Sequence, residues 1–303
     1  MRSPIVHSLR AAWRRLANSK PVAAVLPAPP VIQPKIGLAL GGGFARGVAH
    51  VGILKVFERE HIPLHCITGV SAGSIVAAAY ASGTDVSQIA SIGCAMRFND
   101  VARWTLCRLG LVESERMAAF LKRLLKKFTF EEMKTPLGVL ATDLGTGEPV
   151  SFRDAGDVIL PIRASCSYPG LFQPIRHQGR LLVDGAMCME VPAQLARKMG
   201  ATHVISACLP MQGPAVVPGN MLQVVNRCFQ ILQSRAEESW RRHSDVIVTP
   251  DVTGVAWDGF KSGVEMIEAG ERAAEAILPQ VKKWLEPAYV AAASHPLPAE
   301  VAG

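Results

Sequence analysis

The sequence lacks several features that would indicate a membrane, metal or disulfide-stabilised protein. No run of about 18 apolar residues occurs in the 303-residue chain, so no transmembrane helix is predicted. The seven cysteines include no Cys-X-X-Cys pair and no histidine at zinc-site spacing, so we expect no metal and no other cofactor. An odd number of dispersed cysteines favours reduced thiols in a reducing compartment, which predicts a cytoplasmic protein.

Acidic residues are absent from the first 57 positions, where eight Lys and Arg residues account for the net charge of +7. The remainder has 24 basic against 25 acidic residues, so binding to nucleic acid is not expected. The basic residues of positions 1–20 are segregated from apolar ones at helical spacing, a pattern typical of an interfacial helix on anionic lipid. This predicts peripheral contact with the inner membrane surface; a loose basic tail is the alternative. The apolar positions are Ile5, Val6, Leu9, Trp13 and Leu16.

Aromatic residues are scarce, at 6%, but a hydrophobic share of 49% with 19% charged residues is enough for a large core. Four prolines between 21 and 30 interrupt an apolar stretch, which disfavours a signal peptide there and predicts a linker. We expect a basic segment with a proline-rich linker over 1–34, one domain over 35–286 and a flexible tail over 287–303.

Short apolar runs alternate with amphipathic stretches after the linker, which predicts an α/β fold with three α/β/α layers and a central, mostly parallel sheet. Two strand–turn–helix units come first. Strands are expected at 36–40, 66–70, 137–144, 149–152, 181–183, 203–209 and 246–249, and helices at 48–60, 72–82, 221–242 and 264–285.

A serine lies between glycines at the second of these turns, in Gly69-Val70-Ser71-Ala72-Gly73. A serine on a sharp strand-to-helix turn needs small neighbours for its hydroxyl to project from the sheet edge. The apolar strand before it and the alanine-rich helix after it are the context that this motif requires. Ser71 is therefore a candidate nucleophile.

The first turn is rich in glycine and reads Gly41-Gly42-Gly43-Phe44-Ala45-Arg46-Gly47. Its exposed N–H groups suit an oxyanion of a tetrahedral intermediate. A phosphate loop for a nucleotide is the alternative. It is disfavoured because no acidic residue ends the second strand and no Gly-Lys-Ser/Thr sequence follows.

A carboxylate follows a third apolar run, in Asp184-Gly185-Ala186. Taken alone, this sequence is typical of an ordinary Asp-Gly turn. Because the two glycine-rich turns occur in the same chain, we interpret Asp184 as a candidate partner for Ser71. The catalytic loops of an α/β sheet lie together at one edge, and Asp184 is expected there.

These blocks resemble the patatin-like phospholipases over about residues 36–209. The resemblance includes Arg46-Gly47 with the helix that follows, the serine pentapeptide, Asp184-Gly185-Ala186 and the segment 165–174. It implies a lipid acyl hydrolase of the GXSXG type, a serine esterase active in lipid degradation. Phe44 stands where many members carry a smaller residue, and Ala186 replaces the commoner second glycine.

The resemblance also implies a Ser-Asp dyad. In it Ser71 attacks a fatty-acyl ester of a lipid or phospholipid, and Asp184 accepts its proton. The amides of Gly41, Gly42 and Gly43 would form the oxyanion hole and an acyl-enzyme would follow. Supporting roles fall to Arg46, Gly47, Gly69, Gly73 and Gly185.

Two other functions remain as alternatives. An esterase with a Ser-His-Asp triad would need a histidine after the acid, and His203, His243 and His295 are the candidates. None of them lies in a glycine-rich loop, and His50 is expected to pack or support the glycine loop. The second alternative is a non-catalytic lipid-binding or regulatory protein on the same fold.

An amphipathic pattern between 114 and 128 predicts a helix that Ser114 could cap. Its apolar stripe is typical of a core-facing helix. A mobile cover over the site that touches lipid headgroups is the alternative.

Overall fold

The computed structural model describes residues 33–209, 218–255 and 259–286, all within one compact unit, Gln33–Val290. The predicted N-terminal helix, most of the proline-rich linker, the C-terminal tail and His295 lie outside the described residues. Among the helices that are described, none is long and apolar enough to cross a membrane.

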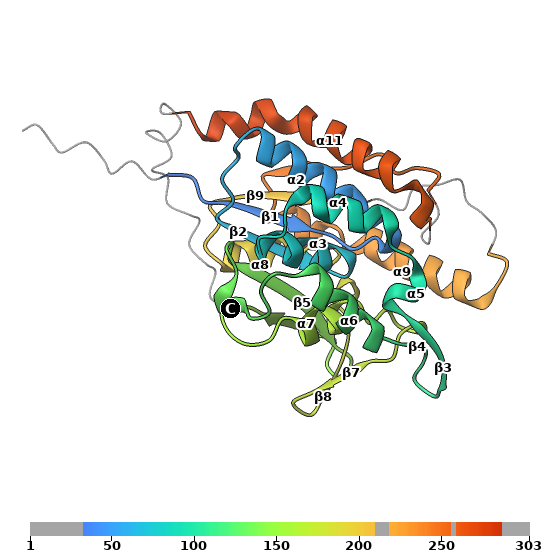
Figure 1. The fold of residues 1–303 in the computed structure, drawn as a ribbon. Helices are drawn as coiled ribbons and strands as arrows, with labels where there is room; N and C mark the ends of the chain where they lie inside the picture. Colours follow the sequence, from blue (N-terminus) through green and yellow to red (C-terminus); the bar gives the residue numbers. More distant parts are fainter. Residues whose placement is uncertain (1–32, 210–217, 256–258, 287–303) are drawn as a thin grey trace, which may run out of the picture. The chain divides into compact units, whose positions relative to one another are not determined.

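A mixed eight-stranded sheet forms the centre of the unit (Figure 1). Its path is β10-β9-β1-β2-β5-β8-β7, with β6 paired to β5. The first five strands of this path are parallel, and β6, β7 and β8 add antiparallel pairs at one side. The strands are β1 (Ile36–Leu40), β2 (Cys66–Val70), β5 (Leu137–Asp143), β6 (Pro149–Phe152), β7 (Ile175–His177), β8 (Arg180–Asp184), β9 (His203–Ala207) and β10 (Val246–Val248).

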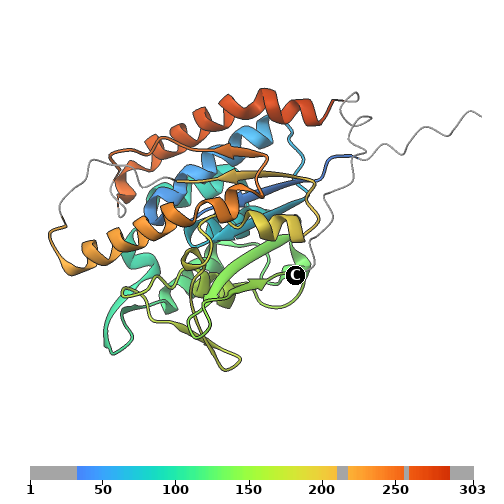
Figure 2. The same ribbon diagram turned by 180° about the vertical axis from the view of Figure 1, so that it is seen from behind.

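Helices cover both faces of this sheet, which confirms the predicted three layers (Figures 1 and 2). Strand β1 shows how the layers are divided, because it is buried along its whole length and its side chains alternate. Leu38 packs in the large core on the side of α2, α4 and α11, whereas Ala39 packs with α8 on the other side. The helices are α2 (Ala49–Arg59), α3 (Ala72–Ala81), α4 (Val86–Ala95), α5 (Phe98–Val101), α6 (Glu115–Leu124), α7 (Ile159–Ser165), α8 (Ala193–Lys198), α9 (Met221–Ala236), α10 (Glu238–Arg241) and α11 (Gly263–Trp284).

The sequence predicted the first two strand–turn–helix units to within two residues, but later features differ. Helices α4, α5, α7 and α8 and strand β7 were not predicted. The single helix expected over 221–242 is divided at Glu237 into α9 and α10. An antiparallel hairpin, β3 (Arg103–Cys107) and β4 (Gly110–Glu113), was not predicted, because its apolar residues do not alternate strictly.

Helix α6 belongs to the core. Met117, Phe120, Leu121 and Leu124 are all buried, so the apolar stripe packs inside the protein and does not form a cover. Ser114 stands at the N-cap position, but its hydroxyl accepts a hydrogen bond from Arg163 Nε at 3.2 Å and does not cap the helix. The core prediction is confirmed, and the predicted cap is wrong.

Helices α2 and α11 cross at a contact between two glycines. A Cβ on Gly52 would collide with the carbonyl oxygen of Ile267, and a Cβ on Gly270 with that of Ala49. The two backbones approach as closely as they do only because both positions lack a side chain. This crossing fixes the long C-terminal helix against the helix that follows the glycine-rich loop.

We predict that Gly52→Ala lowers the free energy of unfolding by about 1–3 kcal/mol or more, because the added methyl group must separate the two helices. Denaturant titration of the purified protein measures this change. Gly93→Ala in α4 is the matched control, since a Cβ there would meet Val48 at an ordinary 3.5 Å. That variant should be neutral or slightly more stable; an equal loss in both variants would contradict the crossing argument.

Candidate active site

Ser71 occupies the turn between β2 and α3 in a backbone conformation that is rare for a residue with a side chain. Its φ is 51° and its ψ −130°, and it is 7% exposed. Such a conformation at a strand-to-helix turn is the strained elbow expected of a serine nucleophile. Gly73 permits the turn, because a Cβ there would collide with the carbonyl oxygens of Leu40 and Gly41. A Cβ added at Gly69 would lie 2.5 Å from Ser74 Cα, and one added at Gly47 would lie 2.6 Å from Ala72 Cβ, so neither position has room for a side chain.

A second serine holds this turn in place. The Ser71 N–H donates to Ser165 Oγ at 2.9 Å, and the Ser165 hydroxyl donates to the Leu140 carbonyl at 2.6 Å. Ser165 thereby connects the elbow to the neighbouring strand β5. The sequence pointed to Ser165 only as part of the segment 165–174, since nothing in its local pattern indicates a partner 94 residues away.

Asp184 reaches the same region from an antiparallel strand. Val70 pairs with Leu140 on β5, and the next β5 residue, Ala141, pairs with Asp184 on β8. Ser71 and Asp184 therefore lie on the two sides of β5, at about the same position along the strand. Two strand spacings separate their backbones by roughly 10 Å, a distance that the two side chains can bridge. Asp184 thus ends a strand that runs opposite to β5 in a sheet that is otherwise mostly parallel.

The Asp184 residue is fixed by hydrogen bonds on three sides. Its N–H donates to the Ser167 carbonyl at 3.0 Å, and its own carbonyl accepts from Thr142 Oγ1 at 3.0 Å. Its Oδ1 accepts from the Ala186 N–H at 2.9 Å. Gly185 allows the chain to turn here, since a Cβ would collide with the Leu140 carbonyl. The commoner glycine at position 186 is not needed for this contact, because alanine supplies the same N–H.

Burial raises the pKa of the Asp184 carboxyl from 3.8 to about 7. The Ser71 hydroxyl and the Ala186 N–H act in the other direction, because both donate to the ionised form. Oδ2 is buried and accepts no hydrogen bond of ordinary length and angle from the described residues. The Ser71 hydroxyl is thus close enough to lower the pKa of the carboxyl, although Oδ2 has no hydrogen-bond partner of ordinary geometry among the described residues. A carboxyl that titrates near neutrality is suited to act as a base.

The three glycines of the loop after β1 differ in what their amides do. Gly41 N–H donates to Ala207 at 2.9 Å and so continues the β1–β9 pairing, which removes it from the predicted oxyanion donors. Gly42 N–H makes a long 3.3 Å bond to the Glu190 carbonyl. Gly43 N–H makes no hydrogen bond to the described residues. Gly42 also lies against the nucleophile, since a Cβ there would be 3.3 Å from Ser71 Cβ.

His50, on helix α2, binds the backbone of this loop. Its Nε2 donates to the Gly41 carbonyl at 2.9 Å, and complete burial lowers its pKa to about 4, so the ring is neutral. The carbonyl can only accept, and therefore the ring proton is on Nε2. His50 has the supporting role that was expected.

A cavity of about 460 Å³ opens over these groups. Ser71, Asp184, Gly42 and Gly43 line it together with apolar and amide side chains, and this size suits a small ligand or an acyl chain. The further lining residues are Phe44, Arg46, Tyr168, Pro169, Leu171, Ala186, Glu190, Leu209, Asn220, Gln223, Val225, Asn226 and Gln233.

Two charged side chains in this lining add to the site, Arg46, which is buried, and Glu190, which is partly buried. Burial lowers the pKa of Arg46 below its ordinary value, and the charge of Glu190 opposes that change. Burial likewise raises the pKa of Glu190. The sequence indicated Arg46 through the loop motif. It did not indicate Glu190, which is 144 positions away and belongs to no motif.

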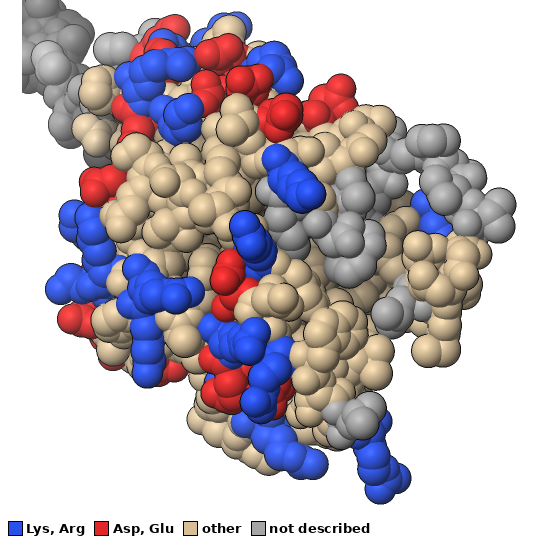
Figure 3. Space-filling view, turned by 45° about the vertical axis from the view of Figure 1, so that its right-hand side comes forward, with Lys and Arg blue, Asp and Glu red and all other residues tan. Residues whose placement is uncertain are grey.

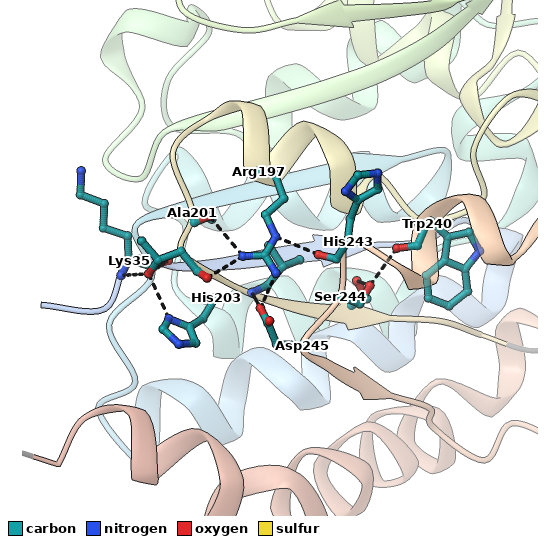
Figure 4. A network of polar contacts seen from close by, with 11 residues as sticks. Lys35, Arg197, Ala201, His203, Trp240, His243, Ser244 and Asp245 are labelled. Carbon is teal, nitrogen blue, oxygen red and sulfur yellow. Dashed lines mark hydrogen bonds and ion pairs between the residues drawn. The ribbon is translucent and has the colours of Figure 1, made fainter. Parts of the chain in front are cut away.

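Among the described residues no histidine lines the cavity. His203 is the first residue of β9 and pairs with Ile36, the first residue of β1, so it lies at the end of the strands that is opposite to Ser71. Its ring lies 4.7 Å from that of Trp284. The His243 carbonyl accepts from Arg197 Nε at 3.0 Å, and Arg197 also binds Asp245 (Figure 4). These two histidines belong to a structural network, and this weighs against the Ser-His-Asp triad.

The family model of the patatin-like phospholipases matches residues 38–197, more than half of the chain. The chain belongs to the patatin-like phospholipase family. The matched range contains β1, the glycine-rich loop, the serine elbow and Asp184.

Relatives within the family have modest identity. An NTE family protein of Mycobacterium tuberculosis, Rv2565, is 26% identical over 272 residues, which cover 80% of this chain and 46% of the relative. The patatin-like phospholipase domain-containing protein ZK370.4 of Caenorhabditis elegans is 32% identical over 180 residues, 56% of this chain and 13% of the relative. This chain therefore spans less than half the length of these relatives.

The crystal structure of VipD from Legionella pneumophila is similar in fold. It superposes with a TM-score of 0.55 at 13% identity and covers 82% of this chain and 67% of VipD. At this identity the similarity concerns the fold alone, and it agrees with the layered patatin-like architecture.

We predict that the buried Asp184 carboxyl makes the protein less stable as pH rises. Between pH 3.8 and about 7 the folded state keeps this proton while the unfolded state has lost it, so the free energy of unfolding falls through that window. Asp184→Asn should remove this pH dependence. The free energy of unfolding of the variant, relative to that of the wild type, should therefore be higher at pH 8 than at pH 4 by on the order of 1–4 kcal/mol. Urea titrations at the two pH values measure it. Ser71→Ala, which keeps the carboxyl, should retain the pH dependence, and its loss in that variant would contradict the assignment.

Proposed function

We propose that this protein hydrolyses fatty-acyl esters of lipids or phospholipids through a Ser71–Asp184 dyad and an acyl-enzyme intermediate. The observation that supports it best is the placement of a strained serine and a carboxyl of pKa about 7 in one cavity, with no histidine among the described lining residues. Family membership supports the same class of reaction. The apolar side chains of the cavity suit an acyl chain.

In the first half-reaction Asp184 Oδ2 accepts the Ser71 hydroxyl proton while Oγ bonds to the ester carbonyl carbon. The negative charge on the carbonyl oxygen is stabilised by the N–H groups of Gly42 and Gly43 and by the start of α3. Breaking of the carbon–oxygen bond then releases the alcohol part, which takes the proton from Asp184.

Water completes the cycle. Asp184, ionised again, accepts a proton from a water molecule that attacks the acyl carbon. The fatty acid leaves and Ser71 Oγ recovers the proton. The strength of the base matters in both halves, and a carboxyl in water, with its lower pKa, would accept the serine proton far less readily.

We expect a fluorophosphonate probe to label Ser71 and the purified protein to release free fatty acid from phospholipid vesicles. Ser71→Ala should abolish both, and Asp184→Asn should lower kcat by about a thousandfold or more. Ser234→Ala is the matched control, because this serine on α9 donates its hydroxyl to the Ile231 carbonyl of the same helix. Mass spectrometry locates the label. Full hydrolysis by Ser71→Ala, or no hydrolysis by any form, would overturn the proposal, and the latter would favour the binding alternative.

We also expect kcat/KM for a soluble ester to rise about tenfold per pH unit up to a plateau above about pH 7, because only ionised Asp184 can accept the proton. The variants His203→Gln and His243→Ala should keep this profile. A rate profile from pH 5 to 9 tests both statements. Loss of activity in a histidine variant that remains folded would point instead to a triad.

A further inference from the structure

Helix α9 presents a row of apolar side chains to solvent. Met221, Val224, Ile231 and Leu232 are exposed by 74, 48, 45 and 61%, and Cys228 is exposed as well. At about 100° per residue these five positions fall within a stripe roughly 100° wide. A stripe of this kind normally faces a core. In the described part of the chain this one faces outward.

The opposite side of the same helix is a wall of the active-site cavity. Gln223, Asn226 and Gln233 line the cavity. Tyr168 Oη donates to Asn226 Oδ1 at 2.9 Å, and Gln233 Nε2 donates to the Ala186 carbonyl at 3.2 Å, two residues from Asp184. The outward apolar stripe is therefore separated from the proposed catalytic groups by the thickness of one helix.

A second exposed apolar element belongs to the same end of the protein. The hairpin β3–β4 carries Trp104, 60% exposed, and Leu109, 54% exposed. Trp104 contacts Phe98 at 5.8 Å, and from Phe98 a row of ring contacts leads through Phe172 to Phe44 in the cavity lining.

The same row continues to α9. Phe44 contacts Tyr168 at 5.9 Å, and Tyr168 contacts Phe229 of α9 at 5.6 Å. The hairpin and α9 are thus connected through the rings beside the cavity, and both views of the ribbon place them on the same side (Figures 1 and 2).

Basic residues outnumber acidic ones on this surface. The β3–β4 hairpin and α9 contain four arginines and one acidic residue, Glu113. Of these, Arg103 pairs with Glu113. In Figure 3 no acidic side chains are visible over the part where α9 lies, and red atoms gather over α11 and near the centre.

We propose that α9 and the β3–β4 hairpin form a docking face for an anionic lipid surface, which presents the cavity to the substrate. Exposed Trp, Leu, Ile and Met side chains among arginines are the composition that inserts at a charged lipid interface. The inference rests on the proposed function, since it explains how a lipid ester reaches Ser71. The face differs from the one predicted from sequence, the basic residues of positions 1–20.

Vesicle co-sedimentation of the full chain tests this face independently of turnover, with Ser71→Ala as the parent protein. Binding should be strong on phosphatidylcholine vesicles that contain phosphatidylglycerol and weak on phosphatidylcholine alone. Replacing Met221, Ile231 and Leu232 together by serine should lower the partition coefficient at least about tenfold, and Trp104→Ser several-fold. Arg227→Ser with Arg235→Ser should lower binding only on the anionic vesicles.

Matched controls come from the opposite end of the protein. Phe128→Ser removes a 39% exposed apolar residue near the far end of α3, where Lys126 N–H donates to Ser82 Oγ. Lys282→Ser with Lys283→Ser removes two charges next to Trp284, which contacts His203. Neither change should alter binding. Hydrogen–deuterium exchange of the parent should show protection by vesicles at 98–112 and 218–236, and this readout needs no variant of the face.

Several results would overturn the docking face. One is undiminished binding by the serine variants; another is protection confined to the first 32 residues. A third is a chain that dimerises through α9, seen by light scattering, with no vesicle binding. Hydrolysis of a soluble short-chain ester separates the two proposals. If vesicles bind but the ester is not cleaved, the proposed function fails and the docking face stands; the reverse result removes only the docking face.

Discussion

The site depends on the burial of one carboxyl group. Asp184 is 1% exposed, and this burial raises its pKa from 3.8 to about 7 against the opposing effect of the Ser71 hydroxyl and the Ala186 N–H. A carboxyl in this condition accepts a proton at neutral pH, which an exposed carboxyl does poorly. The surrounding structure can be understood as the means of holding such a group next to a serine: β5 stands between them, Ser165 binds the elbow, and Thr142 and Ser167 fix the aspartate.

Keeping this group buried costs stability, and the fold contains strong packing elsewhere. The parallel strands are buried on both faces, and α2 and α11 pack backbone to backbone at Gly52 and Gly270. Helix α2 follows the glycine-rich loop directly, and its His50 binds the Gly41 carbonyl. Rigid packing beneath the loop therefore contributes to the placement of the amides above it. Strain at Ser71, with φ of 51°, is tolerated for the same reason.

The sequence predicted what local pattern can encode. Strands 36–40 and 66–70, the serine elbow and the choice of Asp184 as a cavity residue all come from runs, turns and a family motif within a few residues. The pairing of Asp184 with Ala141 on an antiparallel strand could not be predicted, because register between distant strands leaves no local signal. The assignment of Gly41 as an oxyanion donor failed for a related reason: whether an amide faces the cavity or the next strand depends on where β1 stops pairing with β9.

Helices α6 and α9 show a further limit of sequence patterns. Both have an apolar stripe at helical spacing with basic residues beside it. In α6 the stripe is covered by the core, whereas in α9 the stripe is exposed and the amide-bearing side turns inward to the cavity. Periodicity identifies an apolar face but not its partner. Which side of a helix packs against the protein also depends on the side chains of its opposite face. Because α9 turns Asn226 and Gln233 towards the cavity, its apolar side faces away from the described core.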